Sequence, residues 1–238
     1  DDGKRVAQQY PTKRPDGSLP YKIVLRESAM YPDGTSFMDH DVHRVLTRKG
    51  IQCVGGEWYR CTVDDVKAAV LAVRTHTSNV ENRTRDSVMR PEQEAAVDKA
   101  ITYFKSLGSD KFPRFLWNAK MRFGKTFATY QLAKKMDFKR VLILTFKPAV
   151  QSAWEEDLNT HLDFEGWQFI SRPREAGLPN IASQYEQADK ERPIVCFGSF
   201  QDFLGVDKAT GCIKEQHKWV REIEWDLVVF DEYHFGAW

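Results

Sequence analysis

The chain has 238 residues, 42% of them hydrophobic and 29% charged, the balance of a globular protein with one large or two small domains. No apolar run approaches the roughly 20 residues that span a bilayer, and no signal peptide opens the chain, so neither a membrane protein nor a secreted one is predicted. A net charge of +1 excludes a strongly basic nucleic-acid binder, and four cysteines without tight pairing favour a reducing cytoplasm over a disulfide framework.

Residues 1–76 are predicted to form a small α+β domain. After a turn-rich opening, residues 21–25 alternate in the manner of a strand, and residues 57–63 have the composition of a second strand. Helical spacing of apolar residues predicts helices over residues 41–48 and 66–73.

Polar side chains gather where this domain enters its first helix. Two aspartates and two histidines lie within five positions, namely Asp39, His40, Asp41 and His43, and Cys53 and Cys61 follow them. Such a set could bind a metal ion, but structural zinc sites bring their cysteines in tight pairs, and these two are well separated. The favoured interpretation is a polar turn in which Asp39 or Asp41 caps the helix.

The same domain resembles the distal part of the GIY-YIG nuclease fold. The similar segments are residues 4–6, 21–23, 41–46 and 56–59. In that family an early arginine supports the scissile phosphate and a later carboxylate binds a metal ion. The resemblance gives the first role to Arg5 and the second to Asp39 or Asp41, where the family usually has Glu, with His43 and Glu57 beside them. We expect a compact module that presents these side chains on one concave surface but does not cut DNA, because the two tyrosine-bearing strands of the fold have no match.

A polar stretch, residues 77–89, is predicted to link this domain to a second one, residues 90–238. Pro91 suits the first turn of a helix that runs to about residue 107. The buried face of this helix is predicted from apolar residues at helical spacing, namely Val97, Ala100, Ile101 and Phe104.

From residue 112 onward, predicted strands and helices alternate. The predicted strands are residues 115–118, 140–146, 167–171, 194–199 and 226–230. The predicted helices are residues 125–136, 149–161, 180–189 and 214–223. This alternation favours a parallel sheet covered by helices on both faces, and ligands of such sheets bind at the carboxyl ends of the strands.

A phosphate-binding loop is predicted between the first of these strands and the first of these helices. The loop reads Ala119-Lys120-Met121-Arg122-Phe123-Gly124-Lys125-Thr126. Backbone N–H groups and the helix dipole would hold the phosphates of ATP, Lys125 would reach the β- and γ-phosphates, and Thr126 would ligate Mg²⁺. The general pattern has glycine where Ala119 stands. The alternative is a Gly-Lys-Thr sequence that only caps a helix.

Two carboxylates follow the last predicted strand, residues 226–230. Asp231 would hold Mg²⁺, and Glu232 would position the attacking water. A lone Asp-Glu pair after a strand is more often ordinary loop chemistry, but together with the phosphate loop it indicates a nucleotide hydrolase.

Lys125-Thr126 and Asp231-Glu232-Tyr233-His234 resemble motifs I and II of the superfamily 2 helicases and translocases, in a DEAD/DEAH-related variant. Alanine at the first loop position is common in that group. The resemblance implies a RecA-like ATPase domain in which Lys125, Asp231 and Glu232 are catalytic and in which His234 couples the ATP state to nucleic-acid binding.

Two further stretches fit the same family. Residues 90–93 resemble the upstream element whose glutamine, here Gln93, reads adenine. Residues 144–148 resemble motif Ia, which contacts the nucleic-acid backbone, and they make Lys147 and Gln151 the predicted phosphate contacts. Motors of this family have a second RecA-like domain that supplies an arginine finger. Nothing in the chain matches it, so we expect a fragment of a longer protein that hydrolyses ATP very slowly.

The sequence therefore predicts the first motor domain of an ATP-dependent DNA helicase or translocase from a restriction- or phage-related protein. DNA is favoured over RNA as its partner. Two alternatives stay open: a catalytically silent nucleotide- and DNA-binding module, and a P-loop ATPase of another branch.

Overall fold

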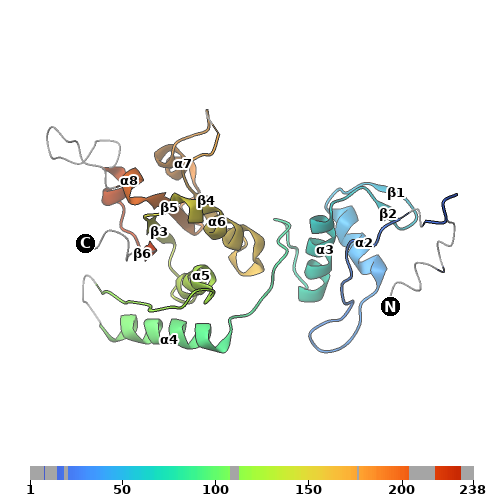
Figure 1. Ribbon diagram of the computed structural model, residues 1–238, viewed down its shortest axis with the longest axis horizontal. Coiled ribbons are helices and arrows are strands. Elements are labelled where there is room, and N and C mark those ends of the chain that lie inside the picture. The colour runs from blue at the N-terminus through green and yellow to red at the C-terminus, as the bar shows by residue number, and fades with distance from the viewer. Residues whose placement is uncertain are drawn as a thin grey trace. The chain divides into compact units, whose positions relative to one another are not determined.

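The computed structural model describes residue 8 and residues 15–18, 21–107, 113–175, 177–203 and 218–231. The chain divides into two compact units, Asp1–Thr84 and Arg85–Trp238, whose elements are labelled in Figure 1. The division falls inside the stretch predicted as a linker.

In the first unit, two helices pack against each other beside a short hairpin. The helices are α2 (Asp39–Arg48) and α3 (Val63–Thr75), and the antiparallel strands are β1 (Cys53–Gly55) and β2 (Trp58–Tyr59). Leu46 of α2 and the alanine-rich face of α3 are buried and form a small core. Both helices include their predicted ranges and extend beyond them.

The segment that follows α3 is fixed to the first unit by buried hydrogen bonds. The Asn79 side chain is fully buried, donates to the carbonyls of Ala68 and Arg83, and accepts from the Arg83 N–H, all at 2.8–2.9 Å. Lys49 donates to the Asn79 carbonyl at 2.7 Å and to the Asn82 side chain at 2.6 Å. The polar residues of this segment therefore form a structured turn.

Two strand predictions in the first unit are wrong. Residues 21–25 form no strand, and their apolar residues Ile23 and Val24 are 41% and 65% exposed. Of residues 57–63, only the two residues of β2 are a strand, because the capping box of Thr62 and Asp65 already begins α3.

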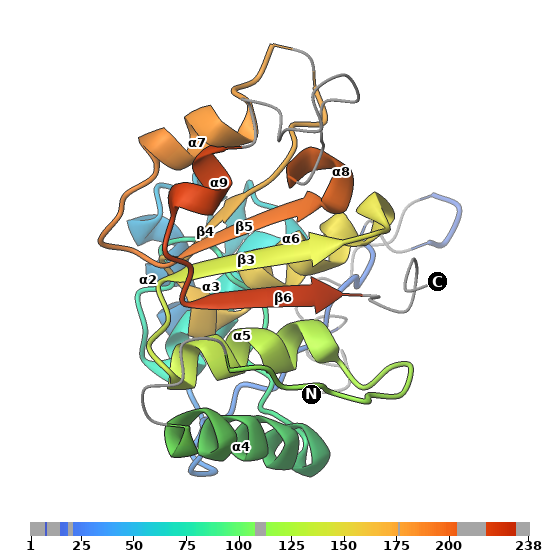
Figure 2. The same ribbon diagram turned by 90° about the vertical axis from the view of Figure 1, so that its left-hand side faces the viewer.

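In the second unit, a parallel four-stranded sheet has the order β4-β5-β3-β6, as Figure 2 shows. Its strands are β3 (Arg140–Thr145), β4 (Gln168–Ile170), β5 (Ile194–Ser199) and β6 (Leu227–Asp231). The predicted parallel sheet is confirmed, and so are these four strands to within one residue at each end.

Helices cover both faces of this sheet. On one face lie α5 (Lys125–Lys135) and α6 (Gln151–Thr160), whose buried side chains share a core with β3 and β5. α4 (Pro91–Ser106) packs on α5 from outside through Val97 and Ala100. The opposite face is covered by α7 (Ile181–Gln187), α8 (Phe200–Phe203) and α9 (Trp219–Glu222). Two 3₁₀ turns, η1 (Pro148–Val150) and η2 (Leu162–Phe164), flank α6.

The strand predicted at residues 115–118 is absent. Phe115 and Trp117 pack against α4 and α5, while Leu116 between them is 84% exposed. The alternation that predicted a strand is therefore real, but residues 115–118 pair with no strand in the described part of the chain. Of the helix predicted at 214–223, residues 214–217 lie outside the described residues, and α9 (Trp219–Glu222) forms within the rest. None of the described helices is both long and apolar enough to cross a membrane.

Candidate nucleotide-binding site

The predicted phosphate loop turns into α5 through a left-handed glycine. Gly124 has φ 80° and ψ 47°, and Lys125 and Thr126 then occupy the first turn of the helix. Arg122 is also left-handed, with φ 63°. A Cβ atom at Gly124 would lie 2.5 Å from the Gln93 Nε2 atom. Position 124 therefore favours glycine for its backbone conformation, and a larger residue there would displace the Gln93 amide.

The start of α4 braces this loop. The Gln93 Nε2 atom donates to the carbonyl of Phe123 at 2.8 Å, and the Arg90 guanidinium donates to the carbonyls of Arg122 (3.1 Å) and Phe123. The Gln93 Oε1 atom accepts from the Arg90 N–H at 2.8 Å. The structure thus brings the predicted glutamine element to the loop, where Gln93 is 5% exposed and contacts backbone. Adenine recognition by Gln93 stays a prediction, and the role of Arg90 was missed.

A cavity of about 290 Å³ opens beside the loop. Its walls come from the segment before α4, from the loop with the start of α5, and from the end of α6. The lining residues are Arg85, Ser87, Val88, Arg90, Gln93, Arg122, Gly124, Phe127, Asp157 and His161. The lining holds three arginines and one acidic residue, and two of the arginines are paired with carboxylates, so the cavity suits a polar ligand.

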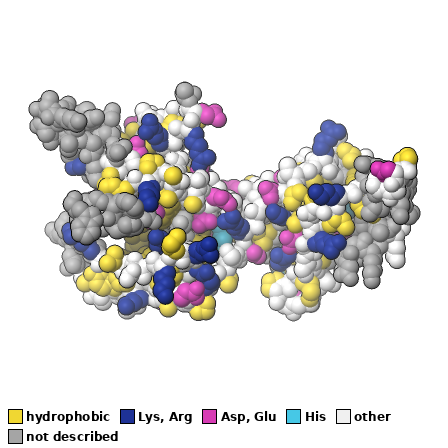
Figure 3. All heavy atoms as spheres, in the orientation of Figure 1, with side chains coloured by type: hydrophobic (Ala, Val, Ile, Leu, Met, Phe, Trp, Pro, Cys, Tyr) yellow, Lys and Arg dark blue, Asp and Glu magenta, His cyan; other side chains and the backbone are white. Residues whose placement is uncertain are grey.

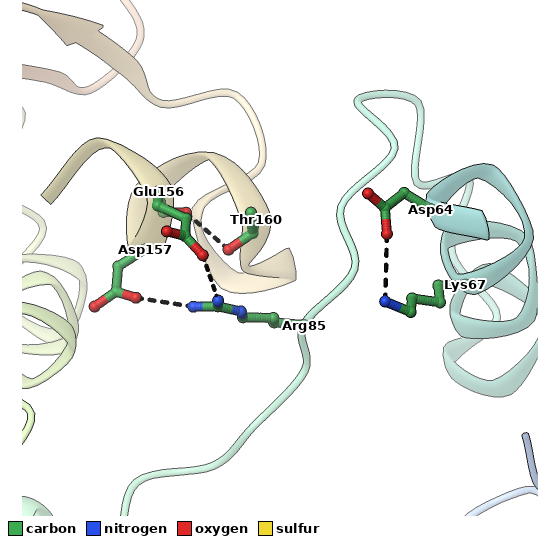
Figure 4. A network of polar contacts seen from close by, with 6 residues as sticks. All are labelled: Asp64, Lys67, Arg85, Glu156, Asp157 and Thr160. Carbon is green, nitrogen blue, oxygen red and sulfur yellow. Dashed lines mark hydrogen bonds and ion pairs between the residues drawn. The ribbon is translucent and has the colours of Figure 1, made fainter. Parts of the chain in front are cut away.

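Arg85 fixes one wall of the cavity to α6, as Figure 4 shows. Its guanidinium contacts the carboxylates of Glu156 at 2.6 Å and Asp157 at 3.0 Å. The backbone N–H of Arg85 donates to the Thr160 carbonyl at 2.9 Å. Burial raises the pKa of the Asp157 carboxyl, and the positive charge of Arg85 opposes that rise.

His161 ties together three segments of the same wall. Its Nδ1 atom accepts from the Asp163 N–H at 3.1 Å, so the proton of the neutral ring is on Nε2, which donates to the Ser87 carbonyl at 2.8 Å. The ring is 3% exposed and lies 4.8 Å from that of Phe127, in the first turn of α5. Sequence analysis did not single out His161, because its partners are distant in the chain.

Asp231 ends β6 beside Thr145, the last residue of β3. The carboxyl end of β6 and the first turn of α5 lie at the same edge of the sheet (Figure 2). The Trp154 Nε1–H of α6 donates to the Asp231 Oδ2 atom at 3.1 Å. Glu232 and His234 lie outside the described residues.

Lys147 and Gln151 occupy the same edge. Lys147 follows β3, and its N–H donates to the Thr145 hydroxyl at 3.0 Å. The Gln151 amide donates to the Ser171 hydroxyl at 2.8 Å, just beyond β4. Nucleic-acid contact by both residues stays a prediction. On the face shown in Figure 3, Lys and Arg side chains are interspersed with Asp and Glu.

The predicted nuclease residues of the first unit lie on different elements. The Asp41 carboxylate accepts from the Met38 N–H at 2.9 Å and also contacts Arg44, and these interactions lower its pKa. Asp41 therefore helps to cap α2, although the N-cap residue itself is Met38. Asp39 lies in the first turn with its side chain 52% exposed.

His43 stacks on Tyr59 of β2 with ring centroids 5.2 Å apart, whereas Glu57 is exposed between the hairpin strands. Arg5 lies outside the described residues. Within the described part of the chain, no group of three His, Cys, Asp or Glu side chains is placed to hold a metal ion.

No family model matches the chain. It is similar to a Mycoplasma pneumoniae protein named as the C-terminus of a candidate type II restriction enzyme and methyltransferase. The two are 38% identical over 152 residues, which is 62% of this chain and 20% of the relative. The chain thus spans about a fifth of that relative's length.

Proposed function

We propose that Arg85–Trp238 is the nucleotide-binding part of an ATP-dependent motor that acts on DNA, of the superfamily 2 helicase and translocase type with a RecA-like fold. The observation that carries the proposal is the arrangement of two motifs. The loop ending in Gly124-Lys125-Thr126 and the carboxylate of Asp231 lie at the carboxyl edge of one parallel sheet, where ligands of such sheets bind.

The residues at this edge fit Mg²⁺-ATP. The first turn of α5 offers backbone N–H groups and a positive helix end to phosphate, next to the Lys125 side chain. Thr126 and Asp231 offer the hard oxygen ligands that Mg²⁺ prefers. The cavity lined by Gln93 and Arg90 adjoins the loop on the side of Gly124 and would receive the rest of the nucleotide.

Similarity to a restriction-modification relative supports DNA as the polymer and an enzyme as the whole protein. In this proposal Lys147 and Gln151 contact the DNA backbone next to the ATP site, because both lie at the same edge of the sheet as Asp231.

Calorimetry with Mg²⁺-ATP tests nucleotide binding. Lys125→Ala should weaken the affinity by about ten- to a hundredfold, because a charge-assisted contact to phosphate is lost. The matched control is Lys99→Ala on the exposed side of α4, which should bind as the unmodified chain does. Equal affinities for all three proteins would show that the loop assignment is wrong.

Steady-state ATP turnover with and without duplex DNA or RNA tests the motor assignment, measured on this chain and on a longer form that carries a second RecA-like domain. We expect very slow turnover by this chain and DNA-stimulated turnover by the longer form. Comparable DNA-stimulated rates for the two would contradict the two-domain motor, and tight nucleotide binding by the longer form without turnover would favour the silent binding module.

A further inference from the structure

Trp154 is the one residue that joins the aromatic core of the second unit to the predicted magnesium ligand within the described part of the chain. It lies in the middle of α6 and is 2% exposed. Tyr130 of α5 packs edge-on against it, with ring centroids 5.5 Å apart, and the Tyr130 hydroxyl donates to the Trp154 carbonyl at 2.9 Å. The ring contact and the hydrogen bond to the backbone therefore hold Trp154 against α5.

A buried indole N–H needs an acceptor, and here the acceptor is the Oδ2 atom of Asp231 at 3.1 Å. The other carboxylate oxygen, Oδ1, makes no hydrogen bond within the described residues. Among the described residues, one oxygen is thus engaged by the core and the second carries no hydrogen bond.

We propose that Trp154 is a positioning residue for Asp231, and this proposal rests on the magnesium role proposed for that carboxylate. The indole N–H fixes the carboxylate plane, so that Oδ1 is presented at the edge of the sheet before any cation arrives. A carboxylate held in this way loses less conformational freedom when it binds a metal, and outer partners of metal ligands typically contribute 10–100-fold to metal affinity.

The test is Trp154→Phe, which removes the N–H and keeps most of the ring. Trp167→Phe is the matched control, because Trp167 packs in the same core and lies 6.3 Å from the Tyr130 ring. The quantity to measure is the Mg²⁺ concentration that gives half-maximal ATP binding. We expect an increase of about tenfold or more for Trp154→Phe, little change for Trp167→Phe, and the same affinity for metal-free ATP in both.

Two outcomes separate this proposal from the proposed function. If the unmodified chain binds ATP with magnesium and the two variants need the same Mg²⁺ concentration, the positioning role is wrong and the nucleotide site stands. If the unmodified chain shows no magnesium-dependent ATP binding, the magnesium role of Asp231 and the positioning role fall together.

A second measurement covers the case in which Trp154→Phe does not fold. In ¹⁵N spectra of the unmodified chain, Mg²⁺-ATP should shift one indole N–H signal, and Asp231→Asn should move that same signal. An indole signal that moves with Asp231→Asn but ignores Mg²⁺-ATP would contradict the proposal.

Discussion

At the scale of single residues, the loop depends on backbone conformations that most side chains resist. Gly124 adopts φ 80° at the start of α5, and the space a Cβ atom would need is taken by the amide of Gln93. Motif matching explains why glycine is found there, but the second reason needed the structure, because Gln93 is 31 residues away in sequence.

We predict that Gly124→Ala weakens Mg²⁺-ATP binding by at least about tenfold and destabilises the second unit by about 1–3 kcal/mol. Gly177→Ala is the control, because Gly177 has φ 90° but no atom within 4 Å of the added Cβ. It bears the same backbone strain without the contact. Calorimetry and urea unfolding measure the two effects. Equal losses of affinity in both variants would show that the Gln93 contact is irrelevant to binding.

A second substitution tests how much the hydrogen bonds of the Gln93 amide stabilise the loop. Gln93→Leu keeps the approximate shape but removes the bonds to the Phe123 carbonyl and the Arg90 N–H. The Phe123 carbonyl keeps its hydrogen bond from the Arg90 guanidinium, so the variant loses hydrogen bonds worth about 0.5–1.5 kcal/mol each, and thermal unfolding should begin at a lower temperature even without nucleotide. Gln168→Leu, at a more exposed amide on β4, is the comparison. Unchanged stability for Gln93→Leu would mean that the loop holds its shape without this brace.

At the scale of elements, β5 is packed so closely that one of its residues cannot carry a side chain. A Cβ atom at Gly198 would lie 2.1 Å from the Phe203 ring of α8. We predict that Gly198→Ala destabilises the second unit by about 1–3 kcal/mol. Adding Phe203→Leu should recover part of the loss, because it makes room for the methyl group. If the double variant loses as much unfolding free energy as the two single variants together, or more, the predicted steric cause is wrong.

The elements also show what sequence patterns can and cannot predict. The range of β5 was predicted to the residue, because six consecutive buried residues leave little choice of boundary. The same kind of pattern gave a wrong strand at residues 115–118. There Phe115 and Trp117 point to one side and pack against helices instead of within a sheet. Arg85 and Trp154 were not assigned to the site because their partners lie 71–77 residues away, and no local pattern encodes such a pairing.

At the scale of the whole molecule, the two units have separate cores. Leu46 and the buried alanines of α3 belong to the first unit, while three hydrophobic clusters lie in the second. We predict that residues 85–238 alone unfold cooperatively and bind Mg²⁺-ATP within about threefold of the intact chain, a difference below 1 kcal/mol. Denaturant unfolding and calorimetry on both proteins provide the comparison. A fragment that is folded but does not bind would show that the first unit contributes to the site.

β3 is hydrogen-bonded on both sides along its length, to β5 and to β6. Successive N–H groups of a strand point to opposite sides, so some of the β3 amide protons bond to β5 and the others to β6. Exchange along the whole of β3 therefore requires both strand pairs to separate, which means that most of the second unit must open. The β3 amide protons should be the slowest to exchange with deuterium, while the two-residue strand β2 should exchange early. Since Thr145 and Asp231 pair at the end of this ladder, the predicted magnesium ligand is attached to the part of the unit that opens last.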